Sequence, residues 1–343
     1  MKRLITLLVF TVLIVLPSSG PIVSAHLTLT PMFSTLEDVT LRDDAFHGKG
    51  KRPYAEWWYF DAVFDNGYTL TMGVKVFNIL GRGGVSTRVD VYRQGFRVLE
   101  SEQTNSMKEF SVSMEIPLVT IERQEIIHGS YDSARSRFDY HISYKTPQCA
   151  FSLQFLGCTQ GWKRQHKAGD WWAVMLPRAT VTGTMTLGGT TMNVTGTGYH
   201  DHIWDVYPRV ALNYGWFWGT FASANYSATW AMTYPLRMSR HPMMVVNEKD
   251  GGYLDIPPET IWFSAKKLRL DHLRLIPMYL NTETMTKNVF LTVTMRVVSI
   301  DHARFLGVIE YWRYHVICSG SIMMHGQMET VEGMFIAEYL RFR

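Results

Sequence analysis

Cysteine and charge are both scarce in this chain of 343 residues, which has three cysteines and 19% charged residues. An odd number of cysteines leaves at least one thiol unpaired, so the chain is not a disulfide scaffold. Cys149 and Cys158 could bridge across a hairpin turn, or all three thiols, with Cys318, could be buried as small apolar groups. Hydrophobic residues make up 46% of the chain, enough for a real core, and this composition excludes disorder.

The motifs of several enzyme classes are also missing. The sequence has no Gly-rich phosphate loop opening a helix, no Gly-x-Ser-x-Gly elbow and no His-Glu-x-x-His. No Cys/His pattern has the spacing of a zinc site. We therefore expect a protein that works without a cofactor.

The first residues have the layout of a cleavable secretory signal. Two basic residues precede an apolar run over 4–16, and Val23-Ser24-Ala25 offers a cleavage site. The run is shorter than the ~18 residues that span a membrane comfortably, and no later segment approaches that length. We predict a signal peptide over 1–25 and a secreted or extracytoplasmic protein with no membrane span. An uncleaved anchor is the alternative.

The charge balance is close to neutral. The formal net charge is +4, and two of these charges belong to Lys2 and Arg3 in the predicted signal. So small a charge on the mature chain implies neither nucleic acid nor an anionic membrane as a partner. Asn193 and Asn225 begin Asn-x-Ser/Thr tripeptides, which are weak signals of N-glycosylation.

Hydrophobic residues alternate with a period of two along most of the chain. The clearest runs are 68–76, 138–144, 179–187 and 290–298, and Gly-rich turns separate the strands. This pattern predicts an all-β fold of barrels or sandwiches. We place two β domains at 26–208 and 209–343, with the boundary near Pro208. Prolines at 177 and at 257–258 indicate strand ends or connections, because proline cannot donate to a ladder.

The segment Glu56-Trp57-Trp58-Tyr59-Phe60-Asp61 is the first of three aromatic clusters. In a strand, Glu56 shares a face with Trp58, and Asp61 shares the other face with Tyr59. A carboxylate walled by rings is desolvated, which raises its pKa and suits it to deliver a proton. The alternative is a strand packed on both sides, with Glu56 paired to an arginine.

The segment Tyr199-His200-Asp201-His202-Ile203-Trp204-Asp205 has the highest density of proton-transfer groups. Alternation places Tyr199 and Asp201 on one face and His200 and His202, with Trp204, on the other. Asp201 and Tyr199 could form an acid and its positioning partner. The two histidines could instead bind a metal, although no third ligand stands out, and we favour acid–base or hydrogen-bonding roles.

Tryptophan is the third feature, with eleven residues in the chain. Trp216-Phe217-Trp218 forms the third cluster, with Trp171-Trp172 upstream and Trp230 and Tyr234 downstream. Tryptophan and tyrosine often line pockets for flat apolar ligands. The alternative is a tryptophan-rich core, which would explain about half of the tryptophans. The candidates for substrate binding are Trp57, Trp58, Tyr59, Trp172, Trp204, Trp216 and Trp218.

Four segments, of which three contain the clusters described above, resemble motifs of the AttH-like and carotenoid 1,2-hydratase superfamily, in the family's order. They are Glu56–Asp61, Gly198–Trp204, Trp216–Gly219 and Gly333–Glu338. The resemblance implies two consecutive lipocalin-like β domains with an apolar pocket at or between them. Known members include carotenoid hydratases, the secreted kievitone hydratase and fungal Diels–Alderases.

In the carotenoid hydratases a Tyr-x-Asp pair is implicated, with the aspartate protonating a double bond. The resemblance assigns these roles to Tyr199 and Asp201. The chain departs from the family at Ile203, where an asparagine is usual, and at Asp205, where a glycine is usual.

The leading hypothesis is a cofactor-free hydratase or cyclase acting on a hydrophobic small molecule such as an isoprenoid, a polyene or a prenylated phenolic. Its candidate catalytic residues are Asp201, Tyr199, His200, His202 and Glu56. One alternative is a Diels–Alderase-type pericyclase, which needs only a shaped pocket and a polarising hydrogen bond. Another is a lipocalin-like carrier without catalysis, against which the buried carboxylates argue.

Overall fold

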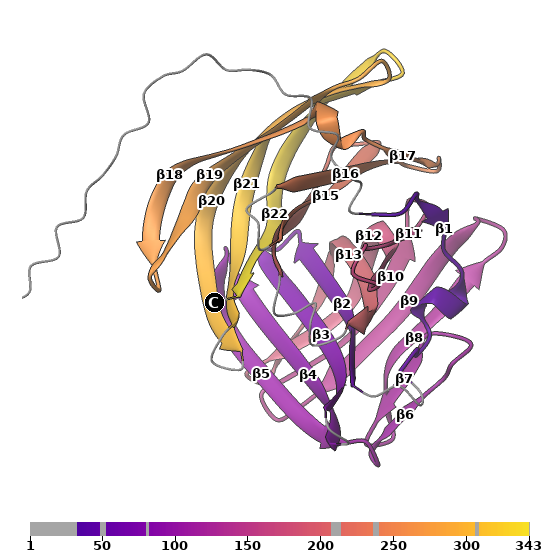
Figure 1. The fold of residues 1–343 in the computed structure, drawn as a ribbon. Helices are drawn as coiled ribbons and strands as arrows, with labels where there is room; N and C mark the ends of the chain where they lie inside the picture. The colour runs from indigo at the N-terminus through magenta and orange to yellow at the C-terminus, as the bar shows by residue number, and fades with distance from the viewer. Residues whose placement is uncertain are drawn as a thin grey trace, which may run out of the picture. The chain divides into compact units, whose positions relative to one another are not determined.

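The chain is all-β, as predicted, and forms two curled antiparallel sheets (Figure 1). The computed structural model describes residues 33–48, 53–79, 82–206, 214–235, 240–305 and 309–342. The predicted signal peptide and Pro208 lie outside these ranges. In the described residues, helix is limited to two 3-10 turns, η1 (Leu41–Asp44) and η2 (Pro258–Thr260). Whether the two sheets are separate domains stays a prediction.

The first sheet has thirteen strands and curls into a nearly closed barrel. Its strand order is β5-β4-β3-β2-β13-β12-β10-β9-β8-β7-β6, with β11 paired to β12 and to β1. The strands are β1 (Glu37–Asp38), β2 (Tyr54–Phe64), β3 (Tyr68–Ile79), β4 (Arg82–Arg93), β5 (Phe96–Ser106), β6 (Phe110–Val112), β7 (Leu118–Ile121), β8 (Gln124–Asp132), β9 (Arg137–Lys145), β10 (Cys149–Gly157), β11 (Trp162–Gln165), β12 (Trp171–Leu187) and β13 (Thr190–Val206).

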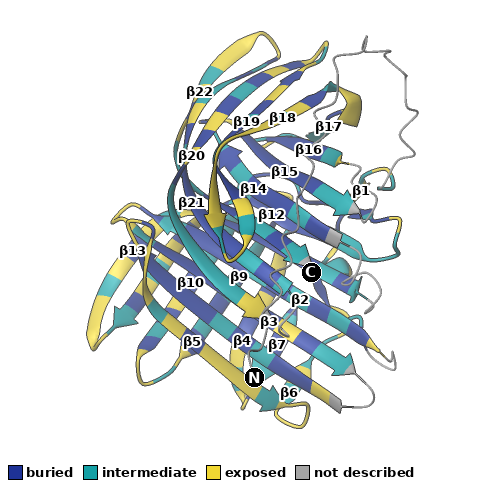
Figure 2. Ribbon diagram, turned by 60° about the vertical axis from the view of Figure 1, so that its left-hand side comes forward, coloured by how far each residue is buried: buried dark blue, intermediate teal, exposed yellow. Residues whose placement is uncertain are grey.

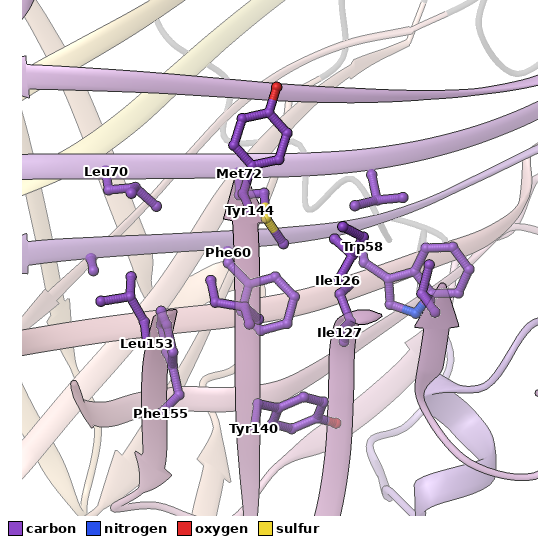
Figure 3. Close-up of a cluster of buried hydrophobic side chains, with 14 of the residues drawn as sticks. Trp58, Phe60, Leu70, Met72, Ile126, Ile127, Tyr140, Tyr144, Leu153 and Phe155 are labelled. Atoms are coloured by element: carbon purple, nitrogen blue, oxygen red, sulfur yellow. The ribbon is translucent and has the colours of Figure 1, made fainter. Parts of the chain in front are cut away.

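Side chains from alternate positions fill the interior of this barrel (Figure 3). Trp58 and Phe60 of β2 are fully buried there, with Tyr140 of β9 and Phe155 of β10. Ser101 of β5 also hydrogen-bonds Tyr144 of β9 inside the barrel at 2.8 Å. Burying each large apolar side chain contributes ~1.5–3 kcal/mol, so this interior is the main source of stability in the first sheet.

The second sheet has nine strands and forms a half-barrel. Its order is β17-β16-β15-β14-β22-β21-β20-β19-β18. The strands are β14 (Tyr214–Ala222), β15 (Tyr226–Pro235), β16 (His241–Glu248), β17 (Tyr253–Asp255), β18 (Ile261–Asp271), β19 (Arg274–Met285), β20 (Val289–Phe305), β21 (Ile309–Met324) and β22 (Gln327–Phe342). Its own core includes Phe217, Trp230, Trp312 and Tyr314.

The prolines behave in two different ways. Pro257 and Pro258 lie in the connection before β18, as predicted. Pro177 does not end a strand, so that prediction is wrong: it lies inside β12, where the register with β13 shifts between Leu176 and Ala179. Pro177 and Arg178 together stand opposite Tyr199 alone, which is a β-bulge, one of the places where a strand tolerates proline.

All three cysteines, which lie in the described part of the chain, are free thiols. Cys149 and Cys318 are buried in the two cores. Of the two interpretations of the cysteines, the structure therefore supports unpaired thiols for all three, with Cys158 only partly buried.

Arg313 of β21 ties the two sheets together. Its Nη1 donates to Thr71 Oγ1 at 2.7 Å and to Asp90 Oδ2 at 2.9 Å, both on the first sheet. Its other guanidinium nitrogens reach Glu338 Oε1 of β22 at 3.3 Å. Arg313 is 8% exposed and Asp90 is 1% exposed, so the interaction is shielded from water and weakly screened.

We predict that Arg313→Met lowers the unfolding free energy by about 3 kcal/mol, because it leaves buried carboxylates without their shared cation. Denaturant titration measures this. The matched control is Arg135→Met, whose Asp132 partner is 2.8 Å away but whose side chain is 44% exposed. This control is expected to change stability by less than ~1 kcal/mol. Equal effects of the two substitutions would contradict the assignment.

Candidate functional site

The pairing of β2 with β13 brings together the first two clusters predicted from the sequence. The strands run antiparallel, with His202 opposite Trp58 and Asp201 opposite Tyr59. Directly opposed residues point to the same face of a sheet. The pairing therefore creates two sets, one inside the barrel and one on its outer face toward the second sheet.

The inner set contains two buried histidine–carboxylate pairs. His200 Nε2 lies 2.9 Å from Asp44 Oδ2, and His202 Nε2 lies 3.0 Å from Glu56 Oε1. The exposed fraction is 0% for both histidines and for Asp44, and 1% for Glu56. Glu56 is thus paired to a histidine, and not to an arginine as one interpretation of the sequence held.

The second nitrogen of each ring also faces an acceptor. His200 Nδ1 is 2.9 Å from the carbonyl oxygen of Tyr59, and His202 Nδ1 is 3.1 Å from that of Asp43. A carbonyl accepts only, so the Nδ1 atom of each ring donates, and the Nε2 atom of each ring shares a hydrogen bond with its carboxyl partner. Burial alone would lower the pKa of His202, but the hydrogen bond and charge of Glu56 outweigh burial and raise that pKa.

Aromatic rings stack on the histidines of these pairs. Trp58 stacks on His202 with ring centroids 4.6 Å apart, and Phe60 stacks on His200 at 3.7 Å. Trp204 stacks on the ring of His47 at 4.2 Å. Figure 3 shows Trp58 and Phe60 within the barrel core. The structure therefore places Trp58 and Trp204 among packed side chains.

The outer set is centred on Asp201. Its Oδ2 accepts hydrogen bonds from the Tyr199 hydroxyl and from Trp172 Nε1, each at 2.8 Å. Burial raises the pKa of Asp201 to about 6, although the bonds from Trp172 and Tyr199 lower it. Burial also raises the pKa of Tyr199 well above its ordinary value, so its hydroxyl keeps its proton.

Asp61 lies directly opposite Tyr199 on the same face. Asp61 is 5% exposed, and its Oδ2 has no hydrogen-bond partner among the described residues. Burial and, next, the neighbouring carboxylate of Glu338 raise the pKa of Asp61 to about 8, against the lowering effects of Tyr59 and Arg313. Asp61 is therefore a carboxylic acid at neutral pH, and Asp201 is mostly a carboxylate.

A cavity of about 430 Å³ opens next to this set. Asp61 and Tyr199 line it, together with Pro177 and Arg178 from the bulge of β12. Arg178 Nη1 is held by the carbonyl oxygens of Ser223 and Ala224, at 2.7 and 3.0 Å. Two further acids, Asp65 and Glu332, line the cavity as well. The apolar part of the wall includes Val63, Phe64, Phe221, Met334, Phe335 and Ile336.

The predicted site residues thus divide between the two faces. Asp201 and Tyr199 lie together on the outer face, but Glu56, His200 and His202 lie inside the barrel, away from the cavity. None of the aromatic residues proposed for substrate binding lines this cavity. Trp172 instead holds Asp201.

The other aromatic residues of the outer face pack around the Asp201 set. Trp218 lies 5.0 Å from the Tyr199 ring and 5.7 Å from the Tyr59 ring, measured between centroids. Trp216 packs against the same cluster. Trp57 lies under the Lys75 ammonium, 5.6 Å from the ring centroid.

The candidate catalytic residues named from the sequence did not include Asp61, Arg178 or Glu338, although Asp61 was noted there as a carboxylate walled by rings. Asp61 was visible from the alternation of β2, which placed it with Tyr59. Arg178 and Glu338 reach the site through a bulge and through the second sheet, and no local pattern indicates either.

The remaining predictions concern metals and glycosylation. In the described ranges, no three His, Cys, Asp or Glu residues are placed to hold a metal ion. Asn193 is exposed in β13. Asn225 is exposed as well, but its side-chain amide donates to Glu329 Oε1 at 2.6 Å. Over the described residues, no helix is long and apolar enough to cross a membrane.

Solved structures share this fold. AttH from Nitrosomonas europaea aligns with 92% of this chain and 100% of its own, at a TM-score of 0.67 and 11% identity. Kievitone hydratase from Nectria haematococca covers 86% of this chain and 92% of its own, at 0.55 and 11%. CghA in complex with Sch210972 covers 91% and 99%, at 0.51 and 11%.

No family model and no curated protein sequence matches the chain. The solved structures confirm, at the level of the fold, the resemblance to the AttH-like and hydratase superfamily that the four motifs led us to expect.

We predict that Glu56→Gln lowers the unfolding free energy by about 3 kcal/mol, because it removes the nearer of the two buried carboxylates that face the imidazolium of His202, Glu56 at 3.0 Å and Asp44 at 3.4 Å. The His128–Glu125 pair is a matched control, with its nitrogen and oxygen 3.3 Å apart and both side chains nearly half exposed. Glu125→Gln should change stability by less than ~1 kcal/mol. A Glu56→Gln protein as stable as wild type would exclude the buried ion pair.

We also predict that Asp61 makes folding pH-dependent. Its pKa rises from an ordinary value near 4 to about 8 on folding, so the folded state binds more protons than the unfolded state in this range. The unfolding free energy should fall by roughly a few kcal/mol as pH rises from about 5 to 8, and Asp61→Asn should remove that fall. Denaturant titrations of wild type, Asp61→Asn and the exposed-turn control Asp250→Asn at several pH values measure it. Parallel curves for all three proteins would contradict the prediction.

Proposed function

We propose that this protein is a cofactor-free enzyme that transfers protons to and from a small hydrophobic molecule, as a hydratase or cyclase. The observation that carries this proposal is the pair of buried carboxylates, Asp61 and Asp201, on either side of Tyr199 at a cavity wall. Their pKa values of about 8 and about 6 separate an acid from a base at neutral pH.

In the proposed reaction, Asp61 is the proton donor. Asp61 lines the cavity and carries a proton on a carboxyl group whose Oδ2 has no other described partner. It would donate this proton to a substrate double bond, leaving a carbocation and an Asp61 carboxylate. Water entering from the cavity mouth would add to the cation, and its surplus proton would return to Asp61. Atoms and charge then balance without a redox partner.

Asp201 does not line the cavity, and it reaches the wall only through Tyr199. The sequence hypothesis gave Asp201 the acid's role. The structure supports a different division, in which the Asp201 carboxylate fixes the Tyr199 hydroxyl and stabilises positive charge that develops nearby. The aromatic rings of Trp218 and Tyr59 behind it keep water out.

The structural relatives support this class of chemistry. Kievitone hydratase is a hydratase by name, and CghA is a Diels–Alderase. The apolar wall of Phe64, Phe221 and Phe335 suits a hydrophobic substrate, and we propose that the protein acts after export. A pericyclase remains the second candidate, because a cavity of about 430 Å³ with the fixed Arg178 could fold a polyene and polarise a carbonyl.

The first test is native mass spectrometry of the protein purified from its own host, with the released ligand identified. A ligand accompanied by a form heavier by one water supports the hydratase. A cyclised isomer of equal mass supports the pericyclase. One unmodified ligand, unchanged on incubation, would reject both and leave a carrier.

We predict that Asp61→Asn then lowers kcat for that ligand by about 100-fold or more, because the amide keeps the shape but holds no acidic proton. Asp201→Asn and Tyr199→Phe should lower kcat by smaller factors and shift the pH profile. Asp250→Asn, in an exposed turn, is the control. Full turnover by Asp61→Asn would remove its acid role, and full turnover by all three site variants would favour the pericyclase.

A further inference from the structure

The hairpin formed by β18 and β19 exposes an unusual amount of apolar surface. β18 is the last strand of the second sheet, and Figure 2 shows it exposed along most of its length. Leu268, Leu270, Leu273 and Leu275 are each more than half exposed, and Trp262 is 73% exposed. A soluble surface seldom gathers large apolar side chains in this way without a partner.

The register shows that this apolar surface is one face of the hairpin. Leu270 lies opposite Leu275, and Leu268 lies opposite Pro277. Ile276, on the other face, is fully buried in the core of the second sheet. The exposed leucines therefore form the outer face, and packing inside the protein does not require them.

The turn at the tip of the hairpin has a backbone conformation that destabilises the folded chain. His272 and Leu273 both have positive φ, 44° and 63°, where tight hairpins normally use asparagine and glycine. Leu273 is also 87% exposed. A leucine held in a left-handed conformation and pointed at solvent weakens the fold, so a contact outside the chain accounts for it better.

Basic residues accompany this apolar face. Lys266 shares the face of Leu268 and Leu270, and Lys267 Nζ lies 4.4 Å from the ring centroid of Tyr279, which stands opposite Lys266. Arg269 and Arg274 lie on the other face beside Asp271, and on the leucine face Glu283 stands opposite Trp262. Asp271 is engaged by Arg269 at 3.0 Å. The net charge of the whole chain is small, so the overall charge balance does not reveal this local excess of basic residues.

We propose that the β18–β19 hairpin docks the protein on an anionic lipid bilayer, with the leucines and Trp262 in the interface and the basic side chains at the headgroups. Apolar side chains beside lysine and arginine suit such a surface, where each basic residue adds binding to anionic lipid. A second copy of this chain is the less suitable occupant, since lysines along an edge strand repel an identical edge. Docking would bring the cavity close to a source of hydrophobic substrate, but it does not depend on the proposed reaction.

The experiment is co-sedimentation of the full chain with vesicles of phosphatidylcholine alone and of phosphatidylcholine with phosphatidylserine, at low and raised salt. Wild type should bind the anionic vesicles and bind them less as salt rises. Lys266→Gln with Lys267→Gln should weaken binding by roughly tenfold or more. Leu268→Gln with Leu270→Gln should weaken it by a similar factor and leave the salt dependence unchanged, because no charge is removed.

The controls carry equivalent changes at other exposed positions. Lys108→Gln with Lys145→Gln removes the same charge elsewhere, and Met328→Gln removes an apolar side chain that is 65% exposed. Both should bind as wild type does. Absent binding, equal binding to neutral vesicles, or equal losses in the control variants would overturn the proposal. So would a dimer in solution that the leucine substitutions dissolve, because the face would then be a contact between copies.

Discussion

The antiparallel pairing of β2 with β13 is the constraint on which the rest of the site depends. It sets Phe60 against His200 and Tyr59 against Asp201, and so it decides which polar groups share a face. A shift of one residue would exchange the two faces, placing Asp201 in the barrel and the histidines outside it. The buried histidine–carboxyl pairs oppose such a shift, because each histidine would then lose its hydrogen-bond partner. The stability of the inner face thereby fixes the geometry of the outer one.

The outer face acquires its chemistry only because the second sheet covers it. Arg313 holds that sheet against Asp90 and Thr71, and Glu338 arrives with it. Burial by this contact is the largest cause of the raised pKa of Asp61, and Glu338 is the next. On an isolated first sheet the same carboxyl group would face water and ionise near its ordinary pKa.

The strands and the division of residues between their two faces could be predicted from the sequence, because period-two alternation is a local property. It predicted strands at 68–76 and 138–144 and put Asp61 and Tyr59 on one face. It could not show which face borders the second sheet, since that depends on residues more than a hundred positions away, such as Arg313. The bulge at Pro177 was hidden for another reason: proline indicates an interrupted ladder, but a strand end and a bulge interrupt it equally. The unusual Asp205 becomes clear only in the structure, where its φ of 58° explains why a glycine is usual there in the family it resembles.

A consequence follows for any molecule that enters the cavity. An apolar ligand displaces water from around Asp61, and desolvation favours the neutral form of a carboxyl group. Binding would therefore raise the pKa of Asp61 further and take up a proton whenever the pH lies near that value. Asp201 does not line the cavity and keeps its bonds from Tyr199 and Trp172, so its pKa should change less. Ligand entry thus widens the difference between the pKa values of Asp61 and Asp201, which makes Asp61 the more distinct acid and Asp201 the more distinct base.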